Sequence, residues 1–352
     1  MGLHTAASPD YDAVVVVSFG GPEGPEEVMP FLRNVTRGRD VPTRRLEEVA
    51  EHYLRRGGRS PINDQNRRLV AALDSALGKA GVDLPVYWGN RNWHPMLAEV
   101  VEAMRADGVR RALAFVTSAF GSYPGCRQYR EDIARAVAGC GGEPEVHKLR
   151  LYWNHPGFIE PAAEGVRGAL SRLGSAEGTG PRLVFTAHSI PTAMATGAPY
   201  ERQLREAASL IAERVPPGPG DALRWDLVYQ SRSGPPQVPW LEPDVVDHLE
   251  GLHREGVGDV VLVPLGFVSD HMEVIHDLDD EAAGAAAAMG MRLVRSPTVG
   301  THPAFVDMIV ELVRERLDPG TPRRALGDSG PWPDFCATDC CPRARRDAGG
   351  VR

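Results

Sequence analysis

The residues best suited to chemistry gather between positions 269 and 281, in the stretch SDHMEVIHDLDDE. Its carboxylates at helical spacing i, i+4, i+7 and i+8 are Glu273, Asp277, Asp280 and Glu281. That spacing places them on one face of a helix, where like charges destabilise the helix. No Lys or Arg lies between His271 and Met291 to offset them. The face is either a solvated acidic surface or a site that attracts cations and moves protons.

A histidine holds a similar position earlier in the chain. The apolar run 183–187 ends at His188. If this run is a parallel strand, His188 lies at the edge of the sheet where ligands bind in open α/β folds. Imidazole, with an ordinary pKa of about 6.5, suits proton transfer at neutral pH. Because residues 269–281 also follow an apolar run, we expect His188 and Glu273 to form an acid–base or metal site. The alternative is a His188 ring that merely caps a turn.

The elements that position these residues alternate between apolar runs and segments of helical periodicity. In the first half we expect strands at residues 11–19, 84–88, 110–118 and 144–152. In the second half we expect them at residues 182–188, 225–230, 257–268 and 291–297. The expected helices are 25–33, 44–55, 63–79, 96–106, 125–138, 157–172, 200–215, 242–251, 272–288 and 303–317. This order predicts an α/β fold of two similar Rossmann-like halves, each a four-stranded parallel sheet flanked by helices.

The pattern divides the chain into three parts. Residues 10–153 form the first half, and residues 154–317 form the second half with His188 and Glu273. Residues 318–352 are rich in Pro, Gly, Asp and Arg and lack periodicity, which is typical of a tail that needs an anchor.

Composition narrows the class of protein. The 352 residues are 42% hydrophobic with a net charge of −8, which argues against a sequence-independent nucleic-acid binder. No apolar run approaches the ~18 to 20 residues that span a bilayer, and residues 1–10 lack the apolar core of a signal peptide. We expect a cytoplasmic protein that is not integral to a membrane.

Short motifs along the chain resemble the ordered signature of the ferrochelatases. In the second half they are HSIP from 188, GAPY from 197, YQSRSGP from 229, PWL from 239 and SDHME from 269. In the first half they are FGGP from 19, GGRSPI from 57 and GNRNWHP from 89. Each is weak alone, but together they are specific and cover about residues 12–316. The resemblance implies two Rossmann-like, chelatase-type halves around a porphyrin cleft, and insertion of the substrate Fe²⁺ into the macrocycle.

The resemblance also implies roles for the residues found above. His188 matches the family histidine that accepts a pyrrole proton or guides the metal, and Glu273 matches its carboxylate partner. The division of proton and metal between the two stays open. Asp277, Asp280 and Glu281 then form a path for cations or protons.

Other positions bear on the porphyrin. Phe19 stands where some relatives carry a tyrosine proposed to coordinate the metal; a phenyl ring cannot, so we expect it to pack on the porphyrin face. Similarity to bacterial coproporphyrin-type enzymes implies propionate contacts from Arg37, Arg39, Tyr53, Ser60 and Tyr123. Both arginines could instead be solvated surface charge. These partners, and the charged stretch 55–59 in place of a hydrophobic lip, favour coproporphyrin III over protoporphyrin IX.

The cysteines suggest a second site. Cys336, Cys340 and Cys341 lie within six residues, and Cys126 opens a predicted helix. Four thiolates are what an iron–sulfur cluster or a structural zinc requires. The resemblance to actinobacterial ferrochelatases implies a 2Fe–2S cluster. Because adjacent ligands are geometrically demanding, Cys140 could replace one of the last pair.

Three rival functions fit parts of the pattern. One is a cobalt or nickel chelatase acting on sirohydrochlorin. Another is a periplasmic-type binding protein, which would need an export signal. The third is a tetrapyrrole carrier or sensor. We expect a monomer whose partners are coproporphyrin III and Fe²⁺, with transient contact to a haem-pathway enzyme; direct synthesis of protohaem from protoporphyrin IX is the alternative activity.

Overall fold

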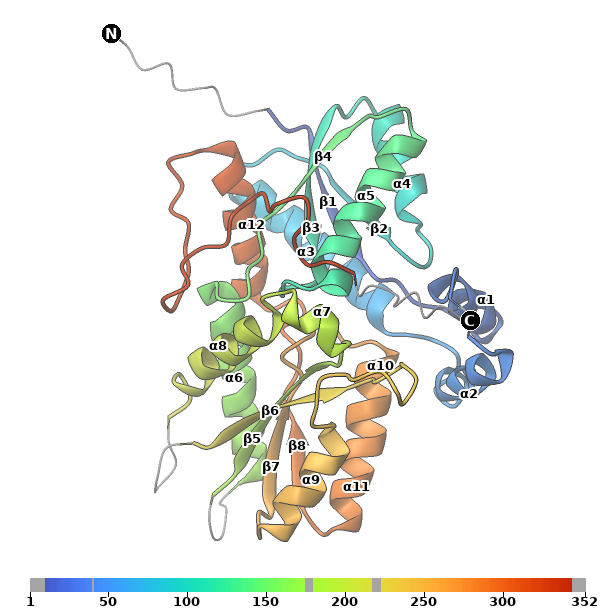
Figure 1. Ribbon diagram of the computed structural model, residues 1–352. Helices are drawn as coiled ribbons and strands as arrows, with labels where there is room; N and C mark the ends of the chain where they lie inside the picture. The colour runs from blue at the N-terminus through green and yellow to red at the C-terminus, as the bar shows by residue number, and fades with distance from the viewer. Residues whose placement is uncertain (1–9, 40, 175–179, 217–222, 344–352) are drawn as a thin grey trace.

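The computed structural model describes residues 10–39, 41–174, 180–216 and 223–343 (Figure 1). The last nine residues of the expected tail lie outside this description. The first sheet has the spatial order β2-β1-β3-β4, with β1 at Ala13–Ser18, β2 at Val86–Asn90, β3 at Arg111–Val116 and β4 at Glu145–Lys148. The second has the order β6-β5-β7-β8, with β5 at Arg182–His188, β6 at Trp225–Gln230, β7 at Asp259–Val263 and β8 at Arg292–Arg295. All pairs are parallel and both halves share one topology, which confirms the predicted fold class.

Helices connect these strands. In the first half they are α1 (Pro25–Val35), α2 (Thr43–Leu54), α3 (Ile62–Lys79), α4 (Leu97–Ala106), the π-helical turn η1 (Tyr123–Arg127) and α5 (Gln128–Gly139). In the second half they are α6 (Pro156–Leu173), α7 (Thr192–Thr196), α8 (Tyr200–Ala212), α9 (Val245–Arg254), α10 (Met272–Val274), the π-helical segment η2 (Ile275–Ala282), α11 (Ala283–Ala288) and α12 (Pro303–Leu317). No helix within the described residues is both long and apolar enough to cross a membrane.

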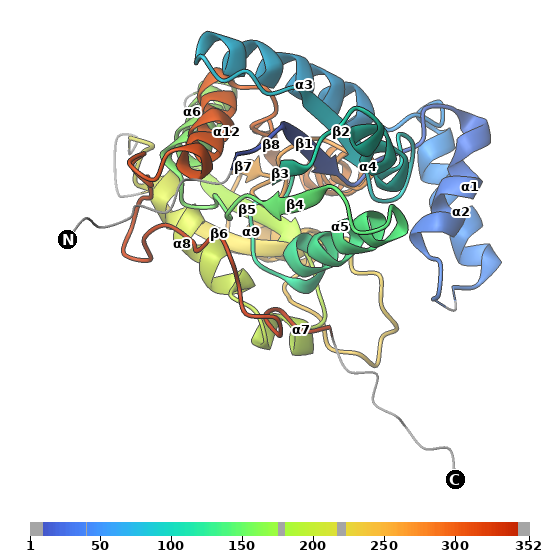
Figure 2. The same ribbon diagram turned by 90° about the horizontal axis from the view of Figure 1, so that it is seen from above.

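Strand β1 shows why the sheets form. All of its side chains are buried, with Val14 and Val16 facing one hydrophobic cluster and Ala13, Val15 and Val17 facing another. Burial on both faces is the condition for a parallel sheet covered by helices. Helices α4 and α5 cover one face of the first sheet, and α3 covers the other. The second sheet lies between α6 and α8 on one side and α9, η2 and α11 on the other (Figures 1 and 2).

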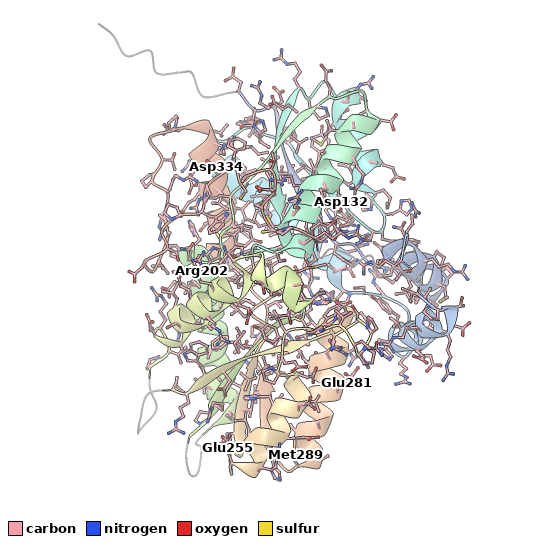
Figure 3. All side chains as sticks on the ribbon, in the orientation of Figure 1. Asp132, Arg202, Glu255, Glu281, Met289 and Asp334 are labelled. Carbon is pink, nitrogen blue, oxygen red and sulfur yellow. The ribbon has the colours of Figure 1, made fainter. Side chains whose placement is uncertain are left out.

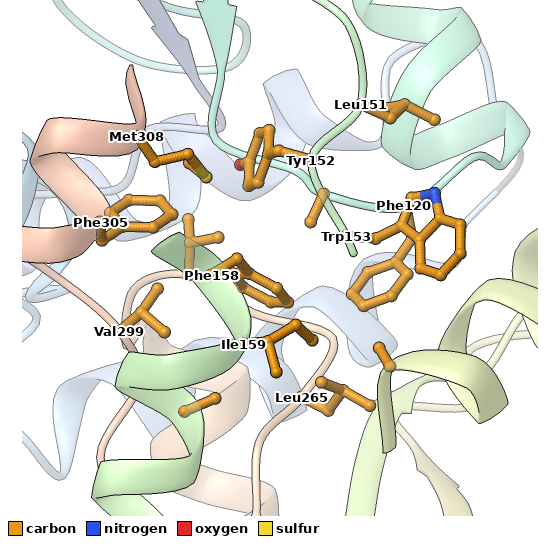
Figure 4. Close-up of a cluster of buried hydrophobic side chains, with 14 of the residues drawn as sticks. Phe120, Leu151, Tyr152, Trp153, Phe158, Ile159, Leu265, Val299, Phe305 and Met308 are labelled. Atoms are coloured by element: carbon orange, nitrogen blue, oxygen red, sulfur yellow. The ribbon is translucent and has the colours of Figure 1, made fainter. Parts of the chain in front are cut away.

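The two halves share one core. Helix α12, at the end of the second half, packs against both α6 and α3. Phe158 and Phe305 meet Tyr152 in edge-to-face contacts, with ring centroids 5.9 Å from the tyrosine in each pair (Figure 4). Trp153 is fully buried in the same cluster. The edges of the two sheets are therefore held in a fixed relation.

A helical hairpin of α1 and α2 lies beside the second half (Figure 1). Its small core contains Phe31 and Tyr53, and Met272 of α10 inserts into it. The hairpin is thus anchored to the helix that carries Glu273.

One predicted strand is too long. Residues 257–268 were expected as a strand, but β7 ends at Val263. Pro264 has no N–H to donate, and the N–H of Gly266 bonds to the carbonyl of Thr186 on the neighbouring strand. The apolar run continues because Leu265 and Val268 are buried in the core without ladder pairing.

Candidate active site

The structure brings His188 and Glu273 together. His188 is the last residue of β5, and its Nε2 lies 3.8 Å from Oε2 of Glu273 on α10. The Nδ1–H of His188 donates to the carbonyl of Ser189 at 2.5 Å. Because a carbonyl only accepts, this bond places the ring proton on Nδ1 and leaves the Nε2 lone pair facing Glu273. Both side chains are partly exposed, at 35% and 49%, so a substrate can reach them.

Asp277 lies one turn beyond Glu273 and is much more buried. Its Oδ2 accepts hydrogen bonds from the Oγ–H of Ser231 and, at 3.3 Å, from Nε2 of Gln230. Burial raises the pKa of Asp277 from 3.8 to about 6, since it outweighs the Ser231 bond, and the charge of Glu273 acts in the same direction as burial. This carboxyl can therefore gain and lose a proton near neutral pH.

The helix with the acidic residues has wide π-helical turns over Ile275–Ala282. Ligand atoms of His276, Asp277 and Glu281 lie within 4.8 Å of one another. Glu281 lies in the second half of the molecule, on the acidic helix (Figure 3), and its Oε1 is 3.3 Å from Nε2 of His276. Such a group could hold a divalent cation.

Asp280 departs from the expected common face. It forms an ion pair with Arg56, just beyond α2, which lowers the pKa of the carboxyl. Arg56 thus supplies, from outside this helix, a positive charge that the helix sequence lacks in the form of Lys or Arg.

Two of the expected porphyrin contacts belong to the hairpin region. Phe19 is partly buried and meets Phe31 edge-to-face at 6.4 Å. Tyr53 is buried against Phe31 at 5.9 Å, and burial, together with the charge of Glu273, raises its pKa. Tyr53, expected as a propionate contact, is therefore buried in the hairpin core, close enough to Glu273 to feel its charge.

The remaining expected propionate contacts are dispersed. Arg37 and Arg39 follow α1, are exposed, and form no ion pair with a described carboxylate. Ser60 is buried against Gly21. The hydroxyl of Tyr123 donates to Glu131 at 3.1 Å, and the guanidinium of Arg343 covers its ring. Of the five expected propionate contacts, only Arg37 and Arg39 present a charge without a described partner.

The four cysteines expected to form a second site lie around one cavity. Cys126 of η1 and the tail residues Cys336, Cys340 and Cys341 line one cavity of about 300 Å³. Arginines of α5 and η1 hold the tail here: Arg127 donates to the carbonyl of Cys340 at 2.9 Å, and Arg130 to that of Thr338 at 3.1 Å. Burial raises the pKa of Cys341 to about 12, and the neighbouring sulfurs add to it.

Cys140 does not join this group. It caps the end of α5, where its carbonyl accepts a hydrogen bond from Arg105, and its side chain packs with the α4–α5 cluster. The suggestion that Cys140 could replace one of the last pair is therefore wrong.

Two residues of this site were not singled out from the sequence. Ser231 and Gln230 were noted only as part of a motif, yet both donate to Asp277. Ser231 adopts a left-handed φ of 60°, rare for a non-glycine residue and common at functional sites. The sequence feature that could have identified Ser231 is its position directly after β6, at the same edge of the sheet as His188.

The fold and the histidine–carboxylate pair at the sheet edge define an α/β protein with a chelatase architecture. A solved structure titled "SirB from Bacillus subtilis with Fe3+" matches it with a TM-score of 0.52 and 13% identity, covering 90% of this chain and all of that one, and this shows the fold alone.

Sequence comparison is more specific. The Ferrochelatase family model matches residues 11–317. A "Ferrochelatase" of Rhodopirellula baltica is 51% identical, covering 97% of each chain. A "Coproporphyrin III ferrochelatase" of Nocardia farcinica is 54% identical, covering 97% of this chain and 99% of the relative. The chain belongs to the ferrochelatase family, and it is an enzyme that inserts iron into a porphyrin.

These comparisons correct the prediction of a 2Fe–2S protein. The relatives are named for coproporphyrin III and iron chelation, and the names carry no iron–sulfur cluster. The classification as an iron–sulfur protein is withdrawn. What the structure establishes is that four sulfurs converge on one cavity.

Proposed function

We propose that this chain inserts Fe²⁺ into coproporphyrin III, with His188 and Glu273 as the reacting pair. The observation that carries the proposal is the 3.8 Å approach of His188 Nε2 to Glu273 Oε2 at the carboxyl edge of the second sheet. The name of the Nocardia farcinica relative supports coproporphyrin III as the substrate.

Metal insertion must remove two pyrrole protons as Fe²⁺ binds the four nitrogens. In our proposal Nε2 of His188 takes the two protons in turn, because Nδ1 already donates to Ser189, and it passes the first to the carboxylates of the acidic helix before it accepts the second. The imidazolium then forms an ion pair with Glu273. That pair favours proton removal because the positive charge arises next to a carboxylate. Oxygen and imidazole ligands also hold Fe²⁺ loosely enough to release it into the porphyrin.

The rest of the acidic helix supplies a route outward. Asp277 has a pKa of about 6 and the charge of Glu273 acts on it, so it can relay a proton towards solvent. Glu281 and His276 extend this route to the surface, where they can also attract the incoming cation. Asp280 contributes charge to the route only when its pair with Arg56 opens.

The catalytic assignment is tested by anaerobic metallation. Loss of free-porphyrin fluorescence is followed with Fe²⁺ and either coproporphyrin III or protoporphyrin IX. Replacing His188 with Ala should lower the rate by about 10²- to 10⁴-fold, the usual contribution of a general base. His253→Ala, an exposed histidine of α9, is the matched control and should leave the rate unchanged. Full activity of the His188 variant would refute the assignment.

Substrate choice is proposed to depend on Arg37 and Arg39. Their exposed guanidinium groups are free to bind propionates, which arginine binds in bidentate geometry. The double Ala variant should raise KM for coproporphyrin III and change KM for protoporphyrin IX less, since protoporphyrin has fewer propionates. Arg44→Ala, an exposed arginine paired with Glu48, is the control. An equal effect on both porphyrins would reduce the two arginines to surface charge.

The remaining expected porphyrin contacts keep narrower roles in this proposal. Phe19 supplies an apolar surface for the macrocycle. Tyr53, Ser60 and Tyr123 would need to shift from their buried or bonded positions to reach a propionate. Their hydroxyls should therefore contribute less to KM than the arginines.

We also propose that the four cavity cysteines act as one group that attaches the tail to η1. Cys336→Ser should loosen residues 332–341 towards proteolysis, whereas Cys140→Ser should not. Elemental analysis of both variants reports whether the sulfurs hold a metal. A cytoplasmic location, which the five unpaired thiols suit, is tested by cell fractionation.

A further inference from the structure

Arg295, the last residue of β8, holds two carboxylates at once. Its Nε donates to Oδ1 of Asp279 at 2.6 Å, and one terminal nitrogen donates to the other oxygen of Asp279 at 3.1 Å. The other terminal nitrogen donates to Oδ1 of Asp270 at 3.0 Å. The Arg295 side chain is only 17% exposed, so this contact is shielded from solvent and salt.

The two carboxylates lie on either side of the catalytic segment. Asp270 precedes α10, and Asp279 lies inside η2. Asp270 is held further by its own N–H, which donates to Oε1 of Gln65 on α3 at 2.9 Å, and by Oγ1 of Thr298 at 3.4 Å. One guanidinium therefore binds both ends of the segment 270–279, which contains Glu273 and Asp277.

The span matters because the helix between them is not an ordinary α-helix. A π-helical turn contains one more residue than an α-helical turn, and π-helical segments are rare and concentrated at functional sites. Rewinding such a turn to α-helix would rotate the residues beyond it by about 100° relative to those before it. Asp279 would then turn away from Arg295, and Asp277 would lose its alignment with Glu273.

We propose that Arg295 is a positioning residue that fixes the π-helical register and so aligns Glu273 with His188 and Asp277 with Ser231. This inference rests on the proposed roles of His188 and Glu273. The guanidinium of Arg295 is already engaged by Asp270 and Asp279. It acts through Asp270 and Asp279, which hold the two ends of the segment in register.

The same sheet offers a matched control. Arg292, at the opposite end of β8, donates to both oxygens of Asp259, each at 2.6 Å. The two arginines are three positions apart along the strand, about 10 Å. Replacing Arg292 thus breaks a comparable bidentate pair in the same strand, at the edge of the sheet away from His188.

The experiment compares Arg295→Gln with Arg292→Gln in the full-length enzyme, measuring initial rates against Fe²⁺ and against coproporphyrin III separately. Loss of a group that orients metal-handling residues typically lowers metal affinity or activity by about 10- to 100-fold. We expect Arg295→Gln to lower kcat/KM for Fe²⁺ by that factor with an unchanged KM for the porphyrin. Arg295→Lys should recover part of the loss, since it keeps the charge but cannot bridge two carboxylates. Arg292→Gln should affect stability alone.

If Arg295→Gln fails to fold, the same kinetics are measured on Asp279→Asn. This substitution removes the charge that pairs with Arg295 and preserves the shape of the side chain. The inference is overturned if the Arg295 variants, or Asp279→Asn, show the kinetics of Arg292→Gln. A fully active His188→Ala would instead overturn the proposed function, so the two failures are distinguishable.

Discussion

Replacing Asp277 with Asn should stabilise the protein at neutral pH while slowing iron insertion. Asp277 is ionised at neutral pH in a buried setting, and its pKa is raised to about 6. The difference from the ordinary value of 3.8 corresponds to about 3 kcal/mol. An amide keeps the shape and can still accept from Ser231, but it has no charge to bury.

The sign follows from proton linkage. Because the folded-state pKa is raised, the folded protein binds a proton more tightly than the unfolded chain between pH 3.8 and about 6. The contribution of Asp277 to stability therefore falls as pH rises through this window, and the full penalty is present above it. Relative to the wild type, the Asn variant should gain about 3 kcal/mol at pH 8 and about half of that at pH 5.

The assay is urea denaturation of both proteins without iron at pH 5 and pH 8, together with metallation rates. Asp280→Asn is the control of opposite sign, because Arg56 lowers the pKa of Asp280, so its loss should weaken the protein above pH 4. A stability gain for the Asp277 variant that is equal at both pH values, or a loss at pH 8, would refute the reasoning. A stabilised variant with full activity would remove Asp277 from the proton route.

Three further predictions concern single contacts of the fold and of the site. Glu315→Gln leaves Arg150 buried without its charged partner, both side chains being 1% exposed, and should lower the free energy of unfolding by about 3–5 kcal/mol in urea denaturation; a loss below about 1 kcal/mol would contradict it. Arg56→Gln removes an exposed pair and should change stability by less than about 1 kcal/mol, with a difference that disappears in high salt. Met272→Ala removes the side chain that joins α10 to the hairpin, and it should lower the free energy of unfolding by about 2–5 kcal/mol and speed hydrogen exchange in α1 and α2. Unchanged exchange in α1 and α2 would show that other contacts hold the hairpin.

The order of elements was predictable because apolar periodicity reports burial directly. Strand β1 and helix α12 illustrate this: the first is buried along its whole length, and the second spans Pro303–Leu317 as its periodicity indicated. The short helix α7 was missed, since five residues are too few to show a helical period.

The approach of His188 to Glu273, our proposed catalytic pair, was predictable for a different reason. His188 and Glu273 each follow an apolar run, and parallel strands deliver their carboxyl ends to one edge. The sequence pattern could not predict how the carboxylates between this pair and the solvent are arranged. Helical spacing put Asp280 on the same face as Asp277, whereas the π-helical turns and Arg56 direct it elsewhere. A π-helical turn cannot be recognised from amino-acid composition. The contacts that support it can also be distant in sequence: Arg56 lies more than two hundred residues from Asp280.

The acidic helix is therefore where local sequence rules and the observed fold disagree. A segment with Glu273, Asp277, Asp280 and Glu281 and no Lys or Arg repels itself, and its turns over Ile275–Ala282 are wider than those of an α-helix. In the described residues, His276 on the same helix compensates part of this charge. The other supporting groups are distant in sequence: Arg56 comes from beyond α2, Arg295 from β8, and Met272 packs into the core of the hairpin. Such exceptions are expected at functional sites, where geometry for the reaction is kept at the expense of local stability. Because the supporting groups come from both halves of the chain, the carboxylates can reach their working positions only after the whole molecule has folded.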